Sequence, residues 1–281
     1  MDSATIYTAV RDRYTTTALT SSSPNYTITA ALAFGYSAAD LSSIPADSNL
    51  GVSCGNPLAL ANLAAGETVV DLGCGAGFDC FLAARKVGVS GHVIGVDMNE
   101  DMLLKARTNA VRSGITNTTF LHSLITSLPL ESASAHVVIS NCVINLVPAA
   151  EKPLVFKEIF RILRPGGRLA VSDILTRKEL PAMMKRDVAL YVGCVAGASR
   201  REEYEGWMRE AGFEEVVVVD AGVDLNVYTR AEDGGEGKER EGCCGAEKPA
   251  AGVVEGMKTS WRDVDLNEWA GSFKIFAVKS I

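Results

Sequence analysis

The segment Val69–Ala84, VVDLGCGAGFDCFLAA, decides the fold of this chain. It joins a short β-branched apolar run to a helical pattern through Gly73, Gly75 and Gly77, which stand at alternate positions. Glycine permits a tight turn and a close approach of backbone to ligand, and the free N–H groups at a helix start attract anions. The spacing differs from the G-x-G-x-x-G of dinucleotide enzymes. The segment therefore predicts a strand, a binding loop and a helix.

An acidic residue further along supports a nucleotide site. Asp97 ends the apolar stretch HVIGVD, about twenty residues beyond Gly77, where a carboxylate can accept hydrogen bonds from both ribose hydroxyls. Taken alone, the glycines could form an ordinary turn, and Asp97 could simply be a capping residue. The two positions together favour the nucleotide site.

Short β-branched runs alternate with helical patterns through the middle of the chain, as in a parallel sheet covered by helices. Strands are predicted at 68–72, 92–97, 118–121, 136–141, 168–173, 215–220 and 273–278, and helices at 78–87, 99–113, 149–163 and 201–211. The stretch RPGG at 164–167 is expected to end a helix and to turn into the next strand.

The composition divides the chain into three regions around one main core. With 281 residues, 47% hydrophobic and 22% charged, one main domain is expected rather than two. Residues 1–60 are expected to form helices that cap a pocket, 61–220 the binding core, and 221–281 a flexible insertion and a final strand. Within the last region, 231–252 is rich in Gly, Glu and Lys, which is typical of a flexible surface segment.

The net charge of the chain restricts the kinds of molecule that it is expected to bind. A net charge of -7 argues against a nucleic-acid-binding surface, because phosphate binding needs clustered Lys and Arg. A small-molecule acceptor is expected instead. The chain starts without a basic segment followed by an apolar run, and no stretch approaches the roughly 20 apolar residues of a membrane span. A cytoplasmic protein without a membrane partner is therefore predicted.

Three widely separated cysteines stand in distinctive contexts. Cys54 lies in SNLGVSCGNPLAL, Cys142 in VVISNCVINLV and Cys194 in YVGCVAGA. An odd total of seven cysteines in a reducing compartment favours reactive, metal-binding or buried thiols over a disulfide framework. Zinc is not expected, because the three histidines show no ligand spacing.

These residues resemble the class I S-adenosylmethionine-dependent methyltransferases. The resemblance implies a Rossmann-like α/β fold, with a seven-stranded, mainly parallel sheet, one antiparallel strand (273–278) and helices on both faces. It also implies that S-adenosylmethionine is bound by Asp71, Gly73, Gly75, Gly77, Asp97 and Met98, with Asn141 at the end of the fourth strand. Because ligands lie at the carboxyl ends of strands in an open α/β sheet, Cys142 is expected to face the transferable methyl.

The resemblance narrows to the arsenite methyltransferases through the strings CGNPLA, ISNCVINL and GCVAGA. It covers roughly residues 34–221 and resumes at 265–279. In that family, cysteines in these strings bind As(III) or reduce the arsenic intermediate, which assigns these roles to Cys54, Cys142 and Cys194. The family also implies thioredoxin or glutathione as the reductant that recycles the enzyme, with arsenite or its thiol conjugates as substrate.

The chain departs from the family at two places. Some members carry a further N-terminal cysteine that takes part in a disulfide, whereas no cysteine here precedes Cys54. Where the family commonly has an acidic residue near the adenine, this chain has Ile125, Thr126 and Ser127. The adenine contact is therefore expected from backbone or hydroxyl groups of Ile125 and Thr126.

The remaining thiols have simpler interpretations. Cys74 is expected to be a small loop residue and Cys80 a helix-packing residue. Cys243 and Cys244 form an adjacent pair in the predicted insertion, which leaves arsenic capture and a dispensable surface position both open.

Two other functions remain open at this point. A quinone- or sterol-type C- or O-methyltransferase would share the fold and the glycine loop, but would need a base or an apolar acceptor pocket instead of three thiols. A non-catalytic metalloid-binding protein would keep the thiols and lose the turnover.

Overall fold

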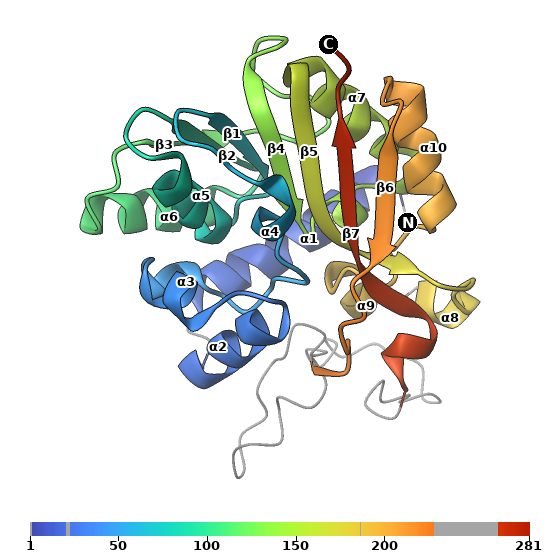
Figure 1. Ribbon diagram of the computed structural model, residues 1–281. Coiled ribbons are helices and arrows are strands. Elements are labelled where there is room, and N and C mark those ends of the chain that lie inside the picture. Colours follow the sequence, from blue (N-terminus) through green and yellow to red (C-terminus); the bar gives the residue numbers. More distant parts are fainter. Residues whose placement is uncertain (1, 21–22, 186, 228–263) are drawn as a thin grey trace.

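A computed structural model describes residues 2–20, 23–185, 187–227 and 264–281 of the chain. Figure 1 shows an open, twisted sheet with helices on both of its faces. The strands are β1 (Thr68–Leu72), β2 (His92–Asp97), β3 (Thr118–His122), β4 (Ala135–Asn141), β5 (Leu163–Thr176), β6 (Val216–Asp220) and β7 (Ala270–Val278). The α-helices are α1 (Ser3–Leu19), α2 (Pro24–Ala33), α3 (Ala38–Ser42), α4 (Leu58–Ala61), α5 (Phe78–Val87), α6 (Glu100–Arg112), α7 (Lys152–Ile162), α8 (Ala182–Lys185), α9 (Val188–Val192) and α10 (Arg201–Ala211). Short 3-10 turns lie at η1 (Ala46–Ser48), η2 (Ile144–Leu146), η3 (Ala149–Glu151) and η5 (Leu266–Glu268).

The sheet has the strand order β3-β2-β1-β4-β5-β7-β6, seven strands within the described residues. β1 pairs in parallel with β2 and β4, and β7 runs antiparallel to both β5 and β6. The predicted mainly parallel sheet with one antiparallel strand is therefore confirmed. The strand order reverses between β1 and β4, and such a switch point is where an open α/β sheet binds its ligand.

The central strand β1 explains why the sheet is covered on both faces. Successive side chains of a strand point to opposite faces. Val70 and Leu72 enter the core cluster formed with α7 and α10, whereas Val69 enters the cluster formed with α5 and α6. Because all three side chains are buried, β1 is apolar on both faces, as the continuous run in its sequence predicts.

The predicted boundaries differ from the structure by up to three residues, except at β5, which begins at Leu163 rather than at residue 168. The RPGG stretch lies within β5 rather than before it. The partner of Ala135 in β4 is Leu163, and the partner of Val137 is already Arg168, so β5 bulges between these pairs. Gly166 adopts a φ of 75° inside the bulge, a left-handed conformation that glycine enters without a steric penalty.

The N-terminal helix α1 packs against α6, α9 and η2, near the carboxyl ends of the strands (Figure 1). The proposed region boundaries at residues 60 and 220 stay predictions. The expected insertion at 231–252 lies outside the described residues, as do Cys243 and Cys244. Within the described residues, no helix is long and apolar enough to cross a membrane.

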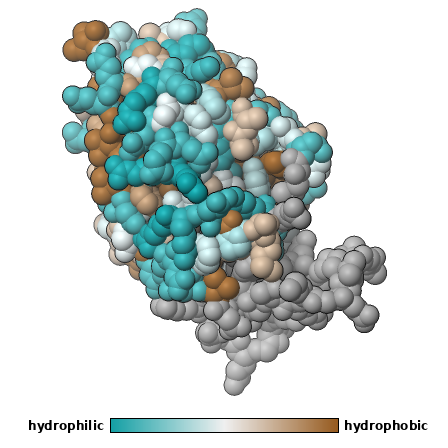
Figure 2. All heavy atoms as spheres, turned by 90° about the vertical axis from the view of Figure 1, so that its right-hand side faces the viewer, coloured by the Kyte–Doolittle hydropathy of each residue, from teal (hydrophilic) through white to brown (hydrophobic). Residues whose placement is uncertain are grey.

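The face beside α10 is largely hydrophilic. Figure 2 shows mostly hydrophilic side chains there, with apolar ones scattered between them. On α10, Glu205 pairs with Arg201 at 2.7 Å and with Arg209 at 3.3 Å, both at i,i+4 spacing. Tyr204 and Met208 on the same helix are fully buried, so α10 is amphipathic and covers one edge of the core.

We expect Ile275→Ala in β7 to lower the free energy of unfolding by about 2 to 5 kcal/mol, because a fully buried side chain is replaced by a cavity. The neighbouring exposed Lys274→Ala should change it by less than about 0.5 kcal/mol. Urea denaturation of both variants measures the difference. Equal stability of the two would contradict the placement of β7 in the core.

Candidate active site

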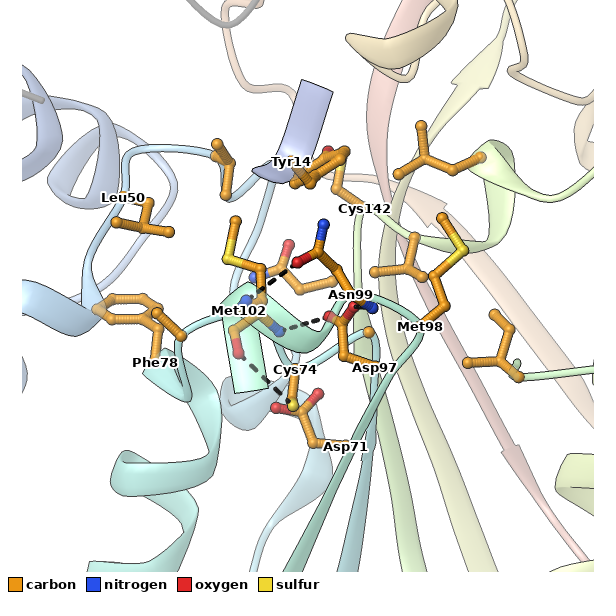
Figure 3. Close-up of a pocket in the computed structure, with 18 of the residues that line it drawn as sticks. Tyr14, Leu50, Asp71, Cys74, Phe78, Asp97, Met98, Asn99, Met102 and Cys142 are labelled. Atoms are coloured by element: carbon orange, nitrogen blue, oxygen red, sulfur yellow. Dashed lines mark hydrogen bonds between the residues drawn. The ribbon is translucent and has the colours of Figure 1, made fainter. Parts of the chain in front are cut away.

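A pocket with an empty volume of about 1040 Å³ opens at the carboxyl ends of β1, β2 and β4. Figure 3 shows its side chains converging from the glycine loop, from the start of α6 and from the loop after β4. Of the predicted cofactor residues, those that line it are Asp71, Gly73, Gly75, Asp97, Met98, Ile125 and Asn141. Gly77 and Thr126 are not among its lining residues. Of the three predicted arsenic cysteines, Cys142 lines the pocket. From α1, Tyr7, Val10 and Tyr14 form part of the wall.

The glycine loop adopts the conformation that its sequence predicts. Gly73, Gly75 and Gly77 have φ values of 69°, 52° and 90°, all in the left-handed region. A Cβ at Gly73 would lie 2.4 Å from the side chain of Val143. Gly77 is the N-cap of α5, so its role in the structure is to start the helix. At Gly73 and Gly75 the loop therefore presents backbone rather than a side chain to the pocket.

Asp97 is fixed at the end of β2 by backbone donors. Its Oδ2 accepts a hydrogen bond from Gly75 N at 2.9 Å, and its Oδ1 accepts one from Asn99 N at 2.8 Å (Figure 3). Burial raises the pKa of this carboxyl above its usual value. Each oxygen keeps a second acceptor position, which suits a ligand with two neighbouring hydroxyls.

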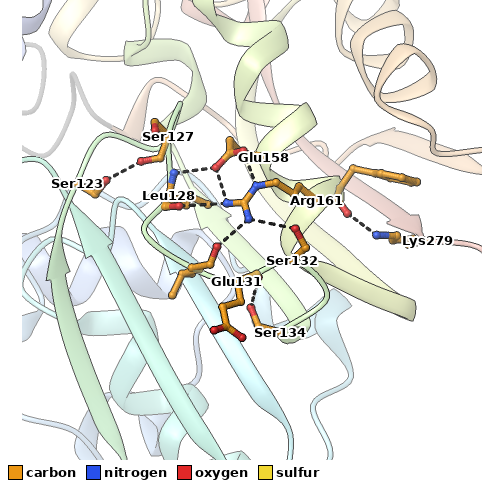
Figure 4. Close-up of polar contacts among 11 residues, drawn as sticks. Ser123, Ser127, Leu128, Glu131, Ser132, Ser134, Glu158, Arg161 and Lys279 are labelled. Atoms are coloured by element: carbon orange, nitrogen blue, oxygen red, sulfur yellow. Dashed lines mark hydrogen bonds and ion pairs between the residues drawn. The ribbon is translucent and has the colours of Figure 1, made fainter.

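The wall formed by Ser123, Leu124 and Ile125 is held by a polar cluster that the sequence did not predict. The Arg161 guanidinium of α7 donates to the carbonyls of Leu128 and Leu130 and pairs with Glu158 at 2.7 Å (Figure 4). Glu158 also accepts a hydrogen bond from Leu128 N at 2.8 Å. These contacts fix the segment after β3, although it lacks the family's acidic residue.

The floor of the pocket carries two buried carboxyl groups. Asp71 is 2% exposed and Asp79, at the start of α5, is 5% exposed. Burial and the charge of Asp79 raise the pKa of Asp71 well above its usual value. Burial also raises the pKa of Asp79 to about 6, against the opposing effect of hydrogen bonds from Asn141 and Tyr36.

Asn141 joins this floor to the first cysteine string. Its amide nitrogen lies 3.0 Å from Asp79 Oδ2, 2.8 Å from the Tyr36 hydroxyl and 2.9 Å from the Gly55 carbonyl. Its Oδ1 accepts a hydrogen bond from Cys54 N at 3.2 Å. One side chain at the end of β4 thus positions both the pocket floor and the N-terminal segment.

The three predicted arsenic cysteines lie together behind the pocket. Cys54 and Cys142 are joined by a disulfide, with their Cα atoms 5.7 Å apart. Cys194 is outside this disulfide, and its Sγ donates to the Cys142 carbonyl at 3.0 Å. The sequence predicted free thiols at all three positions. The structure pairs two of them because segments 88 residues apart are brought to one buried site.

Two of these cysteines have unusual backbones. Cys142 and Cys194 have φ values of 61° and 66°, a region that residues other than glycine rarely occupy. Such conformations persist only where the surrounding structure imposes them, and they cluster at functional sites. They are consistent with the binding role predicted for both residues.

An acidic residue that the sequence did not single out completes the cysteine cluster. A carboxylate oxygen of Asp173, within β5, lies within 4.8 Å of the sulfurs of Cys54 and Cys142. Asn145 donates to Asp173 Oδ1 at 2.8 Å and the Tyr204 hydroxyl to Oδ2 at 2.9 Å. Burial raises the pKa of Asp173 to about 6.

The other cysteines of the described residues occupy the positions expected for packing. Cys80 is fully buried and its Sγ donates to Asp71 Oδ2 at 3.2 Å. Cys74 is buried in the glycine loop, although it also reaches the pocket wall. Burial raises the pKa of the Cys74 thiol to about 11, so this thiol stays protonated.

This sheet order, with a glycine loop and an acidic residue at the switch point, defines the Rossmann-like methyltransferase class. The profile described as "Methyltransferase domain" matches residues 63–212, more than half of the chain. The chain therefore belongs to the methyltransferase domain family.

Particular relatives narrow the similarity further. An arsenite methyltransferase of Halobacterium salinarum is 50% identical over 184 residues, which cover 66% of this chain and 46% of the relative. The arsenite methyltransferase of Mus musculus is 40% identical over 139 residues, 46% of this chain and 36% of the relative. The chain thus spans less than half the length of these curated relatives.

One of the similar solved structures is also an arsenic methyltransferase. The crystal structure of CrArsM, an arsenic(III) S-adenosylmethionine methyltransferase from Chlamydomonas reinhardtii, superposes with a TM-score of 0.59 at 26% identity. The superposition covers 91% of this chain and 74% of that protein.

We expect a disulfide-linked peptide pair containing Cys54 and Cys142 in a non-reducing digest of the purified protein, because the two side chains are bonded in a buried site. Mass spectrometry after alkylation detects the pair, and prior treatment with a reductant should abolish it. Cys194 provides the internal comparison, since it should be alkylated after denaturation without reduction. A linkage of Cys54 or Cys142 to Cys194 would contradict this arrangement.

Proposed function

We propose that this protein transfers methyl groups from S-adenosylmethionine to trivalent arsenic held by Cys54, Cys142 and Cys194. The observation that carries the proposal is the position of Cys142, which lines the pocket on one side and is bonded to Cys54 on the other. The similarity to arsenite methyltransferases along 184 residues supports the same acceptor.

The pocket suits this cofactor in shape and charge. Asp97 offers two acceptor oxygens to a ribose, the glycine loop leaves room for a ligand against the backbone, and Leu124 and Ile125 provide an apolar wall for an adenine. The buried acidic floor complements a positively charged ligand. When bound, S-adenosylmethionine supplies an electrophilic methyl on a sulfonium.

The cysteines supply the acceptor. Thiolate sulfur is a soft ligand that suits a soft centre such as As(III). Three thiolates leave arsenic pyramidal, with a lone pair free as the nucleophile, so the transfer needs no general base. What the protein contributes is alignment, which can be worth about 7 to 11 kcal/mol of the barrier. Cys142 provides this alignment, because it lines the pocket and also belongs to the cysteine cluster.

The same thiols balance the redox change. Transfer of a methyl cation to the arsenic lone pair raises arsenic formally from the trivalent to the pentavalent state. Oxidation of two thiolates to a disulfide returns two electrons and restores trivalent arsenic. The Cys54–Cys142 pair is the oxidised form that this step would leave. An external dithiol or thiol of the thioredoxin or glutathione type would then regenerate both cysteines, consistent with the proposed cytoplasmic setting.

A demethylmenaquinone methyltransferase of Lactococcus lactis is also similar, 38% identical over 151 residues. The cysteine cluster favours arsenic over a quinone acceptor, since a carbon acceptor has no use for grouped thiols. The deciding assay combines the protein with arsenite, S-adenosylmethionine and a thiol reductant, and identifies the methylated products. Arsenic binding without methylated product would instead indicate a metalloid-binding protein.

We expect Asp97→Ala to weaken S-adenosylmethionine binding by about 1.5 to 3 kcal/mol, because it removes hydrogen bonds to a charged group. Arsenite binding should change little, since Asp97 lies on the cofactor side of the pocket. Calorimetric titration of the variant measures both ligands. Unchanged cofactor affinity would remove Asp97 from the site.

We expect Cys142→Ser and Cys194→Ser to abolish arsenite methylation, because a hydroxyl is a harder and poorer ligand for arsenic than a thiolate. Cys54→Ser should abolish methylation of arsenite and spare that of monomethylarsonous acid, which already carries one carbon and needs two thiols. Product analysis by chromatography with arsenic detection distinguishes these cases.

The control for these variants is the double substitution of Cys243 and Cys244 by Ser, which should leave turnover largely intact at saturating arsenite. Wild-type rates in Cys142→Ser or Cys194→Ser would rule out the three-thiol mechanism and favour the quinone- or sterol-type alternative.

A further inference from the structure

Cys74 and Cys80 lie outside the proposed arsenic cluster and form a second pair of thiols beneath the cofactor pocket. Cys74 belongs to the glycine loop and lines the pocket (Figure 3), whereas Cys80 lies in the first turn of α5. Both side chains are buried, with Cys74 6% exposed and Cys80 fully enclosed. Neither thiol has a role in the mechanism above.

The two sulfur atoms converge on one point of β2. A Cβ at Gly95 would lie 2.8 Å from Cys74 Sγ and 2.9 Å from Cys80 Sγ. Real Cβ atoms essentially never approach a neighbour this closely, so any side chain at this position would displace both sulfurs. The glycine in β2 therefore leaves the room in which the two thiols meet.

Both thiols are protonated at neutral pH. Burial raises the pKa of Cys74 to about 11. Burial, followed by the hydrogen bond with the Cys74 thiol, raises the pKa of Cys80 well above its usual value. The Cys80 thiol donates to Asp71 Oδ2 at 3.2 Å, and the Cys74 thiol donates to the Gly75 carbonyl at 3.8 Å. A ligand that bonds to both sulfurs therefore has to take up two protons.

We propose that Cys74 and Cys80 form a second dithiol site, which captures a trivalent arsenical with two exchangeable hydroxyl groups. Two S–H bonds and two As–O bonds break, two As–S bonds form, and two water molecules leave. The hydroxyl groups of the ligand take up both thiol protons, and arsenic stays trivalent, so the step needs neither a base nor an oxidant. Sulfur suits this soft centre. The choice of ligand rests on the proposed function, in which arsenic is the methyl acceptor.

The net charge of the buried site does not change in this step. Two neutral thiols and a neutral arsenical give a neutral complex and water. An added charge would be costly to bury at this depth, whereas a neutral product is not penalised in this way. The enclosed position of the pair is therefore compatible with its occupation.

Occupation of the second dithiol site opposes cofactor binding. Cys74 stands between Gly73 and Gly75, which line the pocket, and Cys80 is enclosed, so the arsenical reaches the pair from the pocket. Gly75 N also donates to Asp97 at 2.9 Å, so a displaced loop disturbs the carboxylate assigned to the ribose. An arsenical on this pair thus competes with the cofactor, and an excess of arsenical becomes inhibitory.

The test counts the molecules of phenylarsonous acid, which has two exchangeable hydroxyl groups, on the chain by native mass spectrometry. The protein is first reduced with a phosphine, because a thiol reductant would compete for arsenic. Cys74→Ser, Cys80→Ser and the double variant should each bind one molecule fewer than wild-type protein, since one arsenic needs both sulfurs. Wild-type stoichiometry in either single variant would overturn the proposal, as would a loss of two molecules in the double variant.

Two controls separate a pair from single thiols. Ser134→Ala changes an exposed residue outside the pocket and should keep the wild-type stoichiometry. Dimethylarsinous acid has one exchangeable hydroxyl group and cannot bridge two sulfurs, so wild-type protein and the double variant should bind it in equal number. A lower number in the double variant would show that the two thiols act independently.

A second variant covers the case in which Cys74→Ser or Cys80→Ser does not fold. It keeps the pair and replaces the other five cysteines of the chain by Ser, namely Cys54, Cys142, Cys194, Cys243 and Cys244. This variant should bind one molecule of phenylarsonous acid, and 2,3-dimercaptopropanol should release it. A folded variant that bound none would contradict the proposal.

The same variant measures the competition with the cofactor. Bound phenylarsonous acid should weaken S-adenosylhomocysteine at least about tenfold in calorimetric titration, and S-adenosylhomocysteine should weaken phenylarsonous acid by the same factor, because coupling between two ligands is reciprocal. Equal affinities with and without the other ligand would rule out the inhibitory role.

The two proposals fail in different ways. If Cys74 and Cys80 captured phenylarsonous acid but the protein formed no methylated arsenic from arsenite, the second dithiol site would stand and the proposed function would fail. If arsenite were methylated and Cys74→Ser and Cys80→Ser bound as many arsenicals as wild-type protein, the proposed function would stand and the second site would be wrong.

Discussion

The hydrogen bonds of the Asn141 side chain are the interaction on which the site depends. The amide stands at the end of β4, at the switch point of the sheet, and contacts Asp79, Tyr36 and Gly55. Its oxygen holds the backbone of Cys54. Because one planar amide bonds both Asp79 and the backbone of Cys54, the floor of the pocket and this cysteine cannot move independently. The sheet thereby sets the distance between the two halves of the proposed reaction.

Burial has a consistent chemical consequence throughout this region. The carboxyl groups of Asp71, Asp79 and Asp173 all have raised pKa values, with burial as the main cause. Lys152, 2% exposed, has its pKa lowered to about 8 for the same reason, and its ammonium donates to Ser199 at 2.8 Å beside the Cys194 loop. A site that excludes water to this degree strengthens each electrostatic contact within it.

The protein imposes unusual local geometry where the proposed chemistry occurs. Cys142 and Cys194 occupy left-handed backbone conformations. A Cβ on Gly197, in the Cys194 string, would lie 2.3 Å from the Asn145 carbonyl. Asn145 belongs to the Cys142 string and also donates a hydrogen bond to Asp173. The Cys142 and Cys194 strings are therefore packed against each other.

The sequence by itself determined the strands of the sheet, the glycine loop and the acid after β2, whereas the antiparallel course of β7 was expected from the family resemblance. Each of the first three depends on local patterns, such as alternating glycines or an apolar run that ends in Asp97, which have the same meaning in any parallel sheet. The three cysteine strings were also visible in the sequence, but not that Cys54 and Cys142 would be bonded. Nothing local marked Asp79, Asp173 or Arg161, because an acid on a helix or strand resembles an ordinary surface charge until its neighbours are known. Their roles follow from long-range packing, which buries them and supplies their partners, and only the tertiary structure decides that.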